Sequence, residues 1–417
     1  MKTVRPEDIG LCSSRLNQIN KLTDSSVQNG EVAGTITLVA RKGKIAHLEC
    51  RGKMSIESNQ AMRADAIFRI YSMTKPVTSV AAMILYERGA FDLLTPISTF
   101  IPEFQHVEVY LNGGAENYQT SKPDREINMG DLLTHTAGLT YDFMNVNVVD
   151  ELYRNQGVKG FDNTVSLDEF TKQAAKMPLL FSPGKFWNYS IATDILGRII
   201  EIISGMPLDE FFKKEILIPL EMNDTDFYVT EEKQDRFTTN YIHRSVMPVD
   251  IQEKSPDQKL FLFDHPTSGS YSQPPAMLSG GGGLTSTMSD YFKFATMLLN
   301  KGRYGKDNYL LSPKTIELMT MNQLPAELAA YSFAKSSGAR MPGLGFGFGF
   351  AMNLAPMMTQ SIGTGGEYGW SGAANTYFII DPKEELIAIY LTQLFPFDMS
   401  QELYRRFKVG VYQSIIE

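Results

Sequence analysis

The strand-like segments of this 417-residue chain lie near its two ends, and the long middle part is mainly helical. Near the amino end, residues 34–41 and 44–51 have the patterns of strands and flank Lys42-Gly43, a pair typical of a hairpin turn. Near the carboxy end lie three further strand-like segments: 346–353, 374–380 and 386–393. Because strands must pair with one another, this distribution predicts one sheet built from both ends of the chain.

Helical patterns flank and separate these strands. Residues 11–29 have an amphipathic pattern that Gly30 ends, so we expect a helix packed on the sheet. Other helical segments follow along the chain: 129–133, 166–177, 191–204, 208–216, 288–299 and 400–416. Residues 110–125 and 240–278 are rich in Gly, Asn, Ser or Pro, and they predict exposed loops.

This order predicts an α/β (α+β) fold, an antiparallel sheet flanked by helices with an inserted α-helical domain. Residues 1–105 and 279–417 would form one discontinuous α/β domain, and residues 106–278 a mainly helical domain. We expect the active site in the cleft between the two domains.

The composition excludes several kinds of partner. The net charge of −8 argues against nucleic acid and against anionic membrane surfaces. The first eight residues carry no apolar signal segment, and no stretch is long and apolar enough to cross a bilayer. We therefore expect a cytoplasmic protein with a small-molecule substrate, and no nucleic-acid or membrane partner.

Nothing in the sequence supports a metal or redox site. The two cysteines, Cys12 and Cys50, form neither a disulfide framework nor a metal-ligand pattern. None of the five histidines has metal-ligand spacing, and His135, in a helix-ending turn, fits a structural role. We therefore expect no metal and no cofactor.

A serine and a lysine three residues apart, Ser72 and Lys75, lie where a strand pattern changes to a helical one. On a helix, such side chains share one face, so a neutral lysine amine could take the serine proton. Burial or nearby positive charge would have to lower the lysine pKa. The start of the predicted helix, from Ser72 to Arg88, would supply N–H groups for an oxyanion. This S-x-x-K spacing occurs in β-lactamases and penicillin-binding proteins, but a capping serine and an exposed lysine give the same pattern.

A tyrosine forms the second notable feature. Tyr189 follows the turn residues Pro183-Gly184 and precedes a strong helical pattern, so its side chain could point into a cleft. Its phenolate would be a capable base if a lysine ammonium stabilised it. A core aromatic with a satisfied hydroxyl is the alternative interpretation.

Two glycine-rich stretches complete the pattern. Residues 280–283 lack the Lys-Ser/Thr of a phosphate-binding loop, and we expect them to let backbones approach closely beside a site. Residues 365–373 precede a strand, where a backbone N–H could complete an oxyanion hole. Ser371 lies in a near match to the nucleophile elbow, but that motif requires a helix after it, so the assignment fails.

Taken together, three stretches resemble the serine β-lactamase-like superfamily in the same chain order: Ser72-Met73-Thr74-Lys75, Tyr189-Ser190-Ile191 and Trp370-Ser371-Gly372. The sequence is most similar to family VIII carboxylesterases and lovastatin-type acyltransferases, which share the class C β-lactamase fold. The resemblance implies that Ser72 is acylated and that Lys75 and Tyr189 handle protons. It also implies an oxyanion hole made by the N–H groups of Ser72 and Ala373, beside the substrate-binding residues Trp370, Ser371 and Gly372.

Two departures from class C β-lactamases bear on the substrate. Ile191 stands where those enzymes have an asparagine, which removes an amide donor for a β-lactam side chain. Trp370 stands where they have a lysine, which removes the cation for a substrate carboxylate. Both departures favour neutral esters.

The sequence therefore predicts a serine carboxylesterase that cleaves esters of small or medium acyl groups through a Ser72 acyl-enzyme. One alternative is an acyltransferase, in which another acceptor replaces water. A second is a weak β-lactamase or D-amino-acid peptidase. A third is a non-catalytic binding protein that keeps the fold and only forms a stable acyl adduct.

Overall fold

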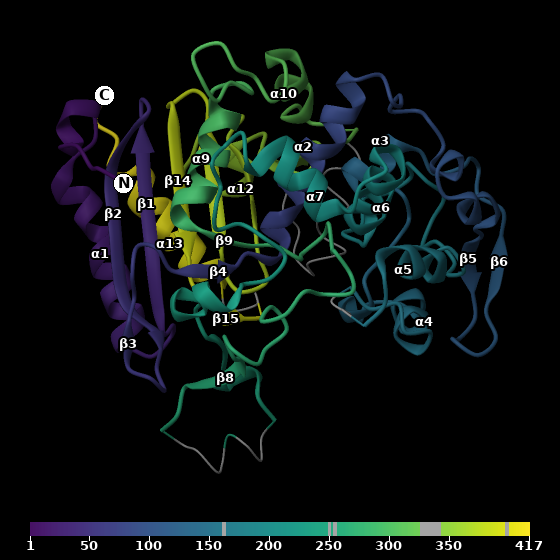
Figure 1. The fold of residues 1–417 in the computed structure, drawn as a ribbon, viewed down its shortest axis with the longest axis horizontal. Helices are drawn as coiled ribbons and strands as arrows, with labels where there is room; N and C mark the ends of the chain where they lie inside the picture. Colours follow the sequence, from purple (N-terminus) through teal and green to yellow (C-terminus); the bar gives the residue numbers. More distant parts are fainter. Residues whose placement is uncertain (161–163, 249–251, 253–256, 326–342, 397–399) are drawn as a thin grey trace.

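The computed structural model describes residues 1–160, 164–248, 252, 257–325, 343–396 and 400–417. Its centre is an eight-stranded sheet in the order β10-β11-β12-β13-β14-β1-β2-β3 (Figure 1). All neighbouring strands in it are antiparallel, which confirms the predicted antiparallel sheet. The strands are β1 (Gly34–Arg41), β2 (Lys44–Ser55), β3 (Gln60–Ala61), β10 (Leu344–Phe346), β11 (Ala351–Asn353), β12 (Tyr368–Ser371), β13 (Tyr377–Asp381) and β14 (Leu386–Leu391).

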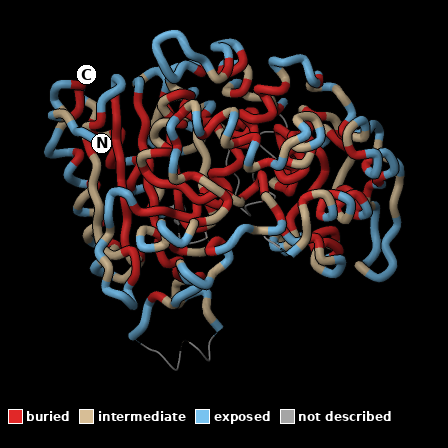
Figure 2. The backbone as a smooth tube through the Cα atoms, viewed as in Figure 1, coloured by how far each residue is buried: buried red, intermediate tan, exposed pale blue. Residues whose placement is uncertain are grey.

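The two ends of the chain meet at the centre of this sheet. Strand β1 pairs with β14, from Ile36 opposite Leu391 to Arg41 opposite Leu386. Every residue of β1, β13 and β14 is buried. A strand buried on both sides needs cover on both faces of the sheet, and Figure 2 shows these buried strands inside an exposed periphery.

Helices α1 (Ser13–Gln28) and α13 (Ser400–Tyr412) cover one face of the sheet. Because side chains alternate along a strand, Val39 of β1 and Ala388 of β14 point to this face. They pack in one apolar cluster with Phe407 of α13. The two terminal helices therefore close the core behind the sheet.

Helices α2 (Thr74–Glu87) and α9 (Met288–Leu299) lie on the opposite side. Leu38 is next to Val39 in β1, and Ile389 is next to Ala388 in β14. Both side chains point to this side and pack with Phe294 of α9. Twelve of the fourteen residues of α2 are buried, because α2 is enclosed between the sheet side and the helical part of the molecule.

The helical part gathers on the right of Figure 1, away from β1 and β2. Its main helices are α3 (Met129–Thr134), α4 (Val148–Asn155), α5 (Leu167–Ala174), α6 (Ala192–Ser204) and α7 (Leu208–Phe212). Two short helices, α10 (Pro313–Met319) and α12 (Pro356–Thr359), belong to the carboxy-terminal part. No helix among the described residues is long and apolar enough to cross a membrane.

The predicted loop at 110–125 was wrong in part, because it contains a short hairpin. Strands β5 (Val109–Asn112) and β6 (Gln119–Ser121) pair antiparallel across a turn at Gly113. Gly113 has a φ of +105°, which favours glycine. The Asn- and Gly-rich composition correctly indicated a turn, but it did not reveal the two strands beside it.

The predicted loop at 240–278 also contains strands. Strand β7 (Asn240–His243) pairs with β8 (Leu260–Asp264), and β7 also pairs with β15 (Leu394–Phe395) from far along the chain. Residues 249–251 and 253–256 of the predicted loop lie outside the described residues.

The single strand predicted at 346–353 is two strands. Strands β10 and β11 pair across a turn in which Gly349 has a φ of +89°. The alternating Gly and Phe residues imitate strand periodicity, but the turn glycines bend the chain back on itself.

Candidate active site

Strand β4 (Ile67–Arg69) leads directly to Ser72. This strand pairs with β9 (Thr285–Thr287), and the chain then makes a short 3-10 turn, η2 (Tyr71–Met73). Tyr71 has a φ of +42°, a conformation rare for a bulky residue. The α-helix therefore begins at Thr74, which corrects the prediction that it begins at Ser72.

Lys75 lies in the first turn of α2, and its amine is held beside Ser72. The Lys75 Nζ lies 3.3 Å from the Ser72 Oγ and donates a hydrogen bond of 2.7 Å to the Gly281 carbonyl. The side chain is only 1% exposed. Burial lowers the pKa of Lys75 to about 7, and the Asp194 carboxylate opposes this shift. Near neutral pH a large fraction of the amine is therefore uncharged and able to accept a proton.

Tyr189 approaches Ser72 from the other side. Its hydroxyl donates a hydrogen bond of 2.6 Å to the Ser72 Oγ, across 117 residues of sequence. Residues just before α6 fix the turn, since the Asn188 N–H donates to the His135 carbonyl at 2.9 Å. Burial raises the pKa of Tyr189 above its ordinary value, although the Ser72 hydroxyl lowers it in part. Tyr189 is therefore a neutral phenol near pH 7, and it suits a proton donor better than the predicted phenolate base.

Ala373 lies in the turn between β12 and β13, next to the segment that carries Ser72. A Cβ added at Gly372 would lie 2.3 Å from the Ile70 carbonyl oxygen, so the turn packs directly on the chain before Ser72. Within the part of the chain that the structure describes, the backbone N–H groups of Ser72 and Ala373 donate no hydrogen bond to a carbonyl outside their own helix or strand. Both N–H groups are thus available for an oxyanion.

Trp370 belongs to an aromatic group around Tyr189. The Trp370 ring centre lies 5.5 Å from that of Tyr189 and 5.3 Å from that of Phe346. His135 and Trp187 also contact Phe346, with ring centres at 5.4 and 5.6 Å. Burial lowers the pKa of His135 well below its ordinary value, so its ring is neutral near pH 7. This wall of the site is therefore apolar and uncharged.

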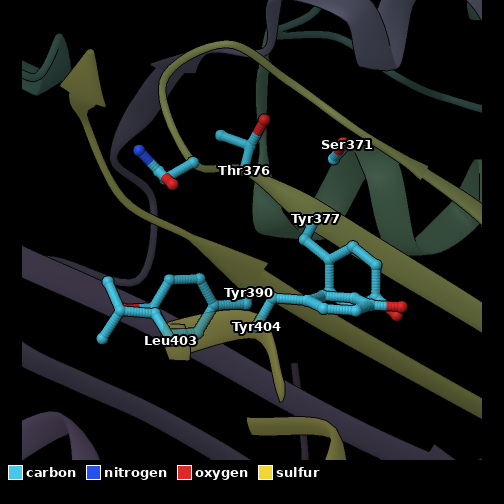
Figure 3. A pocket seen from close by; sticks show the side chains of 7 residues that line it. Ser371, Thr376, Tyr377, Tyr390, Leu403 and Tyr404 are labelled. Carbon is cyan, nitrogen blue, oxygen red and sulfur yellow. The ribbon is translucent and has the colours of Figure 1, made fainter. Parts of the chain in front are cut away.

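Ser371 faces away from this aromatic wall. Side chains alternate along β12, and the Ser371 side chain lines a small cavity of about 10 Å³ with Tyr377, Tyr390 and Tyr404 (Figure 3). Tyr404 comes from α13, on the opposite face of the sheet from α9. The structure thus brings Trp370 and the Ala373 turn to the Ser72 side, but not the Ser371 side chain.

Two residues behind Lys75, Asp194 and Ser279, were not predicted as site residues. The Asp194 carboxylate accepts hydrogen bonds from the Ser279 hydroxyl and the Gly281 N–H, and Gly281 in turn accepts from Lys75. The signal for Asp194 was a single acidic residue inside the otherwise apolar start of α6. The close approach expected of glycines 280–283 is confirmed, because a Cβ at Gly280 would lie 2.6 Å from the Thr193 carbonyl.

Metal ligands are not grouped in the described part of the chain. No cluster of three or more His, Cys, Asp or Glu side chains there could hold a metal ion. Cys12 and Cys50 are both free thiols. His135 makes a hydrogen bond of 3.2 Å between its Nδ1 and the Ser190 Oγ, in agreement with a structural role.

Comparisons with known proteins place the chain in a family. A family model described as Beta-lactamase matches residues 19–411. Protein Rv1367c of Mycobacterium tuberculosis (strain ATCC 25618 / H37Rv) is 33% identical over 376 residues, which cover 88% of this chain and 87% of that protein. Esterase EstB of Burkholderia gladioli is 28% identical over 409 residues, covering 95% of this chain and 94% of EstB.

A solved structure extends the similarity to the whole fold. EstCE1, described as a hydrolase with promiscuous acyltransferase activity, superimposes with a TM-score of 0.79 at 24% identity. The match covers 96% of this chain and 99% of EstCE1. The predicted β-lactamase/transpeptidase-like fold is thereby confirmed.

Proposed function

Because the chain belongs to the β-lactamase family, we propose that it is a serine carboxylesterase acting on neutral esters of small or medium acyl groups. The observation that carries this proposal is the double contact at the Ser72 Oγ, with the Tyr189 hydroxyl at 2.6 Å and the Lys75 amine at 3.3 Å. A serine held between a neutral phenol and an amine of pKa about 7 is equipped for acyl transfer.

The first half of the proposed reaction acylates Ser72. The Ser72 Oγ attacks the ester carbonyl carbon and gives its proton to the neutral Lys75 amine. The oxyanion accepts hydrogen bonds from the N–H groups of Ser72 and Ala373. When the carbon–oxygen bond of the ester breaks, the departing alkoxide takes the Tyr189 proton, and the Lys75 ammonium returns a proton to Tyr189.

The second half hydrolyses the acyl-enzyme. Water enters where the alcohol left, and it gives a proton through Tyr189 to Lys75 as its oxygen attacks the acyl carbon. The bond between the acyl carbon and the Ser72 Oγ then breaks, the carboxylic acid leaves, and Ser72 regains its proton from the Lys75 ammonium. In this proposal the α/β domain of residues 1–105 and 279–417 contributes Ser72 and Lys75, and the domain of residues 106–278 contributes Tyr189.

The preference for neutral esters is supported by the aromatic wall. Trp370, which is partly exposed, would face the substrate with apolar surface, and the buried Phe346 and Trp187 lie behind it, so a substrate carboxylate would lose its hydration there without gaining a cation. An apolar acyl chain would gain from burial against the same rings. We therefore propose ester hydrolysis well above β-lactam hydrolysis.

One set of assays tests the proposal. The purified protein is compared on p-nitrophenyl acetate, butyrate and octanoate and on nitrocefin, beside the variants Ser72→Ala and Ser58→Ala. Ser58 is an exposed serine and serves as the matched control. We expect ester turnover by the parent and by Ser58→Ala, and a loss of at least about 10³-fold in Ser72→Ala. A preference for nitrocefin, or an active Ser72→Ala, would overturn the proposal.

Acyl transfer is a second candidate, favoured by the similarity to EstCE1, whose description combines hydrolase and acyltransferase activity. Both reactions use the same acyl-enzyme and differ only in whether water or another nucleophile attacks it. Adding a primary alcohol to the p-nitrophenyl butyrate assay separates them. Formation of a new butyrate ester at the expense of butyric acid would support transfer, and unchanged butyric acid would support hydrolysis alone.

A further inference from the structure

The residue of interest is Asp194, a fully buried acid near the start of α6. Its Oδ1 accepts a hydrogen bond of 2.5 Å from the Ser279 hydroxyl and one of 3.0 Å from the Gly281 N–H. Its Oδ2 has no hydrogen-bond partner among the described residues. Burying a carboxylate with one unpartnered oxygen costs desolvation free energy, so we expect a specific interaction to account for an acid at this position.

Gly281 connects Asp194 to the proposed base. Its N–H donates to Asp194, and its carbonyl accepts from the Lys75 Nζ at 2.7 Å. A Cβ added to Gly281 would lie 2.5 Å from the Asp194 Oδ2, so the glycine and the carboxylate are in direct contact. The position of the Gly281 carbonyl thus depends on Asp194.

The geometry at Lys75 explains why that carbonyl matters. A neutral amine has two N–H donors and one lone pair. When one N–H is committed to the Gly281 carbonyl, the amine can turn its lone pair toward the Ser72 hydroxyl at 3.3 Å. An amine without this anchor would rotate among several orientations, and few of them would accept the Ser72 proton.

We propose that Asp194 is a positioning residue of the reaction: it fixes Gly281 so that the Lys75 amine is aimed at Ser72, and it places a buried negative charge near that amine. This inference rests on the proposed function. Asp194 acts through Gly281 and Lys75.

The charge of Asp194 affects the pKa of Lys75, a quantity that a purely structural role of Asp194 would leave unchanged. The titratable groups around Lys75 are Asp194, His135, Tyr141 and Tyr189. Burial keeps His135 neutral by lowering its pKa, and keeps both tyrosines neutral by raising theirs. Burial also raises the pKa of Asp194, and the Lys75 charge and the hydrogen bonds from Ser279 and Gly281 oppose that shift and favour the carboxylate. Asp194 opposes the effect of burial on the pKa of Lys75, so removing its charge should lower that pKa below about 7.

The test is the rate of Ser72 phosphonylation by a fluorophosphonate probe, measured from about pH 5 to about pH 9, which needs no ester turnover. For Asp194→Asn we expect a rate at least about tenfold below the parent on the plateau. We also expect the midpoint of the acid limb to lie at least about half a pH unit lower. Ser279→Ala is the control: it removes a neutral hydrogen-bond donor but keeps the carboxylate, so its midpoint should match that of the parent.

The outcomes separate the two proposals. A parent that the probe does not label at Ser72 would contradict the proposed function itself. A labelled parent with an Asp194→Asn variant of unchanged plateau and midpoint would overturn only the role of Asp194. Should Asp194→Asn fail to fold, Asp194→Glu decides, because it keeps the charge on a longer side chain. We then expect an unchanged midpoint with a plateau about tenfold lower, and a parent-like plateau would overturn the inference.

Discussion

Two lysines are buried among the residues that the structure describes, and their surroundings differ in a way that separates chemistry from structure. Lys75 on α2 and Lys408 on α13 are 1% and 4% exposed. The amine of Lys408 forms an ion pair with Glu367, a carboxylate that also accepts a hydrogen bond of 2.9 Å from the Asn353 side chain. The amine of Lys75 contacts only the neutral Gly281 carbonyl and the Ser72 hydroxyl among its hydrogen-bond partners in the described chain.

A fold can keep a buried amine reactive by holding carboxylates out of direct contact with it. The Lys408–Glu367 pair ties α13 to the residues that lead into β12, so its contribution is to stability. At Lys75 the nearest carboxylate, Asp194, acts across Gly281 instead of touching the amine. The amine therefore has a pKa of about 7 and can release and accept protons near neutral pH.

Lys75→Met should have the largest effect on activity. We expect ester kcat/KM to fall about 10³-fold, because the proposed base is lost while an apolar chain of similar length fills its site. The melting temperature should not fall, since a desolvated amine is removed. Steady-state assays with p-nitrophenyl butyrate and thermal unfolding check both statements. A rate within about tenfold of the parent would remove Lys75 from the mechanism.

Lys408→Met should give the opposite result. It leaves Glu367 buried without its cation, so we expect the free energy of unfolding to fall by about 3 kcal/mol. The kcat per folded molecule should stay within about threefold of the parent, because Lys408 makes no contact with Ser72. Urea unfolding and active-site titration with a fluorophosphonate measure the two quantities. The double variant Lys408→Met/Glu367→Gln should recover part of the lost stability, and a double variant no more stable than Lys408→Met would argue against an unpaired carboxylate as the cause.

Tyr189→Phe tests the proton donor proposed beside Ser72. The variant keeps the ring against Trp370 but removes the hydroxyl that lies 2.6 Å from the Ser72 Oγ. We expect kcat to fall about 10²-fold or more, because the leaving alkoxide loses its proton donor. Esters with a good leaving group need that proton less, so the loss should be larger for ethyl butyrate than for p-nitrophenyl butyrate. Equal losses on both esters would assign Tyr189 a role other than proton donation.

The proposed catalytic pair was predictable from sequence because its geometry is local. Ser72 and Lys75 are three residues apart at a strand-to-helix change, and that spacing alone brings their side chains together. Tyr189 lies 117 residues from Ser72. Its position after a turn made it a candidate, but only the order of motifs that resemble a known family connected it with Ser72. The hydrogen bond between Asp194 and Gly281 behind Lys75 was predictable neither from local spacing nor from the resemblance, since the two residues meet across 87 residues through tertiary packing.

The same reasoning separates the parts of the fold that were predicted from those that were not. The helix at 288–299 and the strand at 34–41 carry their periodicity in their own residues, and both agree with the structure. Strand β7 is four residues long and is defined by its partners β8 and β15, one of which lies about 150 residues further along the chain. Short strands of this kind depend on pairing, which residue patterns do not reveal.

The pH dependence is the finest test of the contrast between the two lysines. Lys75 must be uncharged to accept the Ser72 proton, and its pKa is about 7. The kcat/KM of the parent should therefore fall about tenfold for each pH unit below about 7 and level off above it, because kcat/KM reports ionisations of the free enzyme. Lys408→Met should keep this acid limb, whereas the residual activity of Lys75→Met should lose it. If the acid limb of the parent is instead centred near pH 4 to 5, about the ordinary pKa of a carboxyl group, the titrating group is a carboxylic acid. That result would contradict the statement that burial lowers the pKa of Lys75 to about 7.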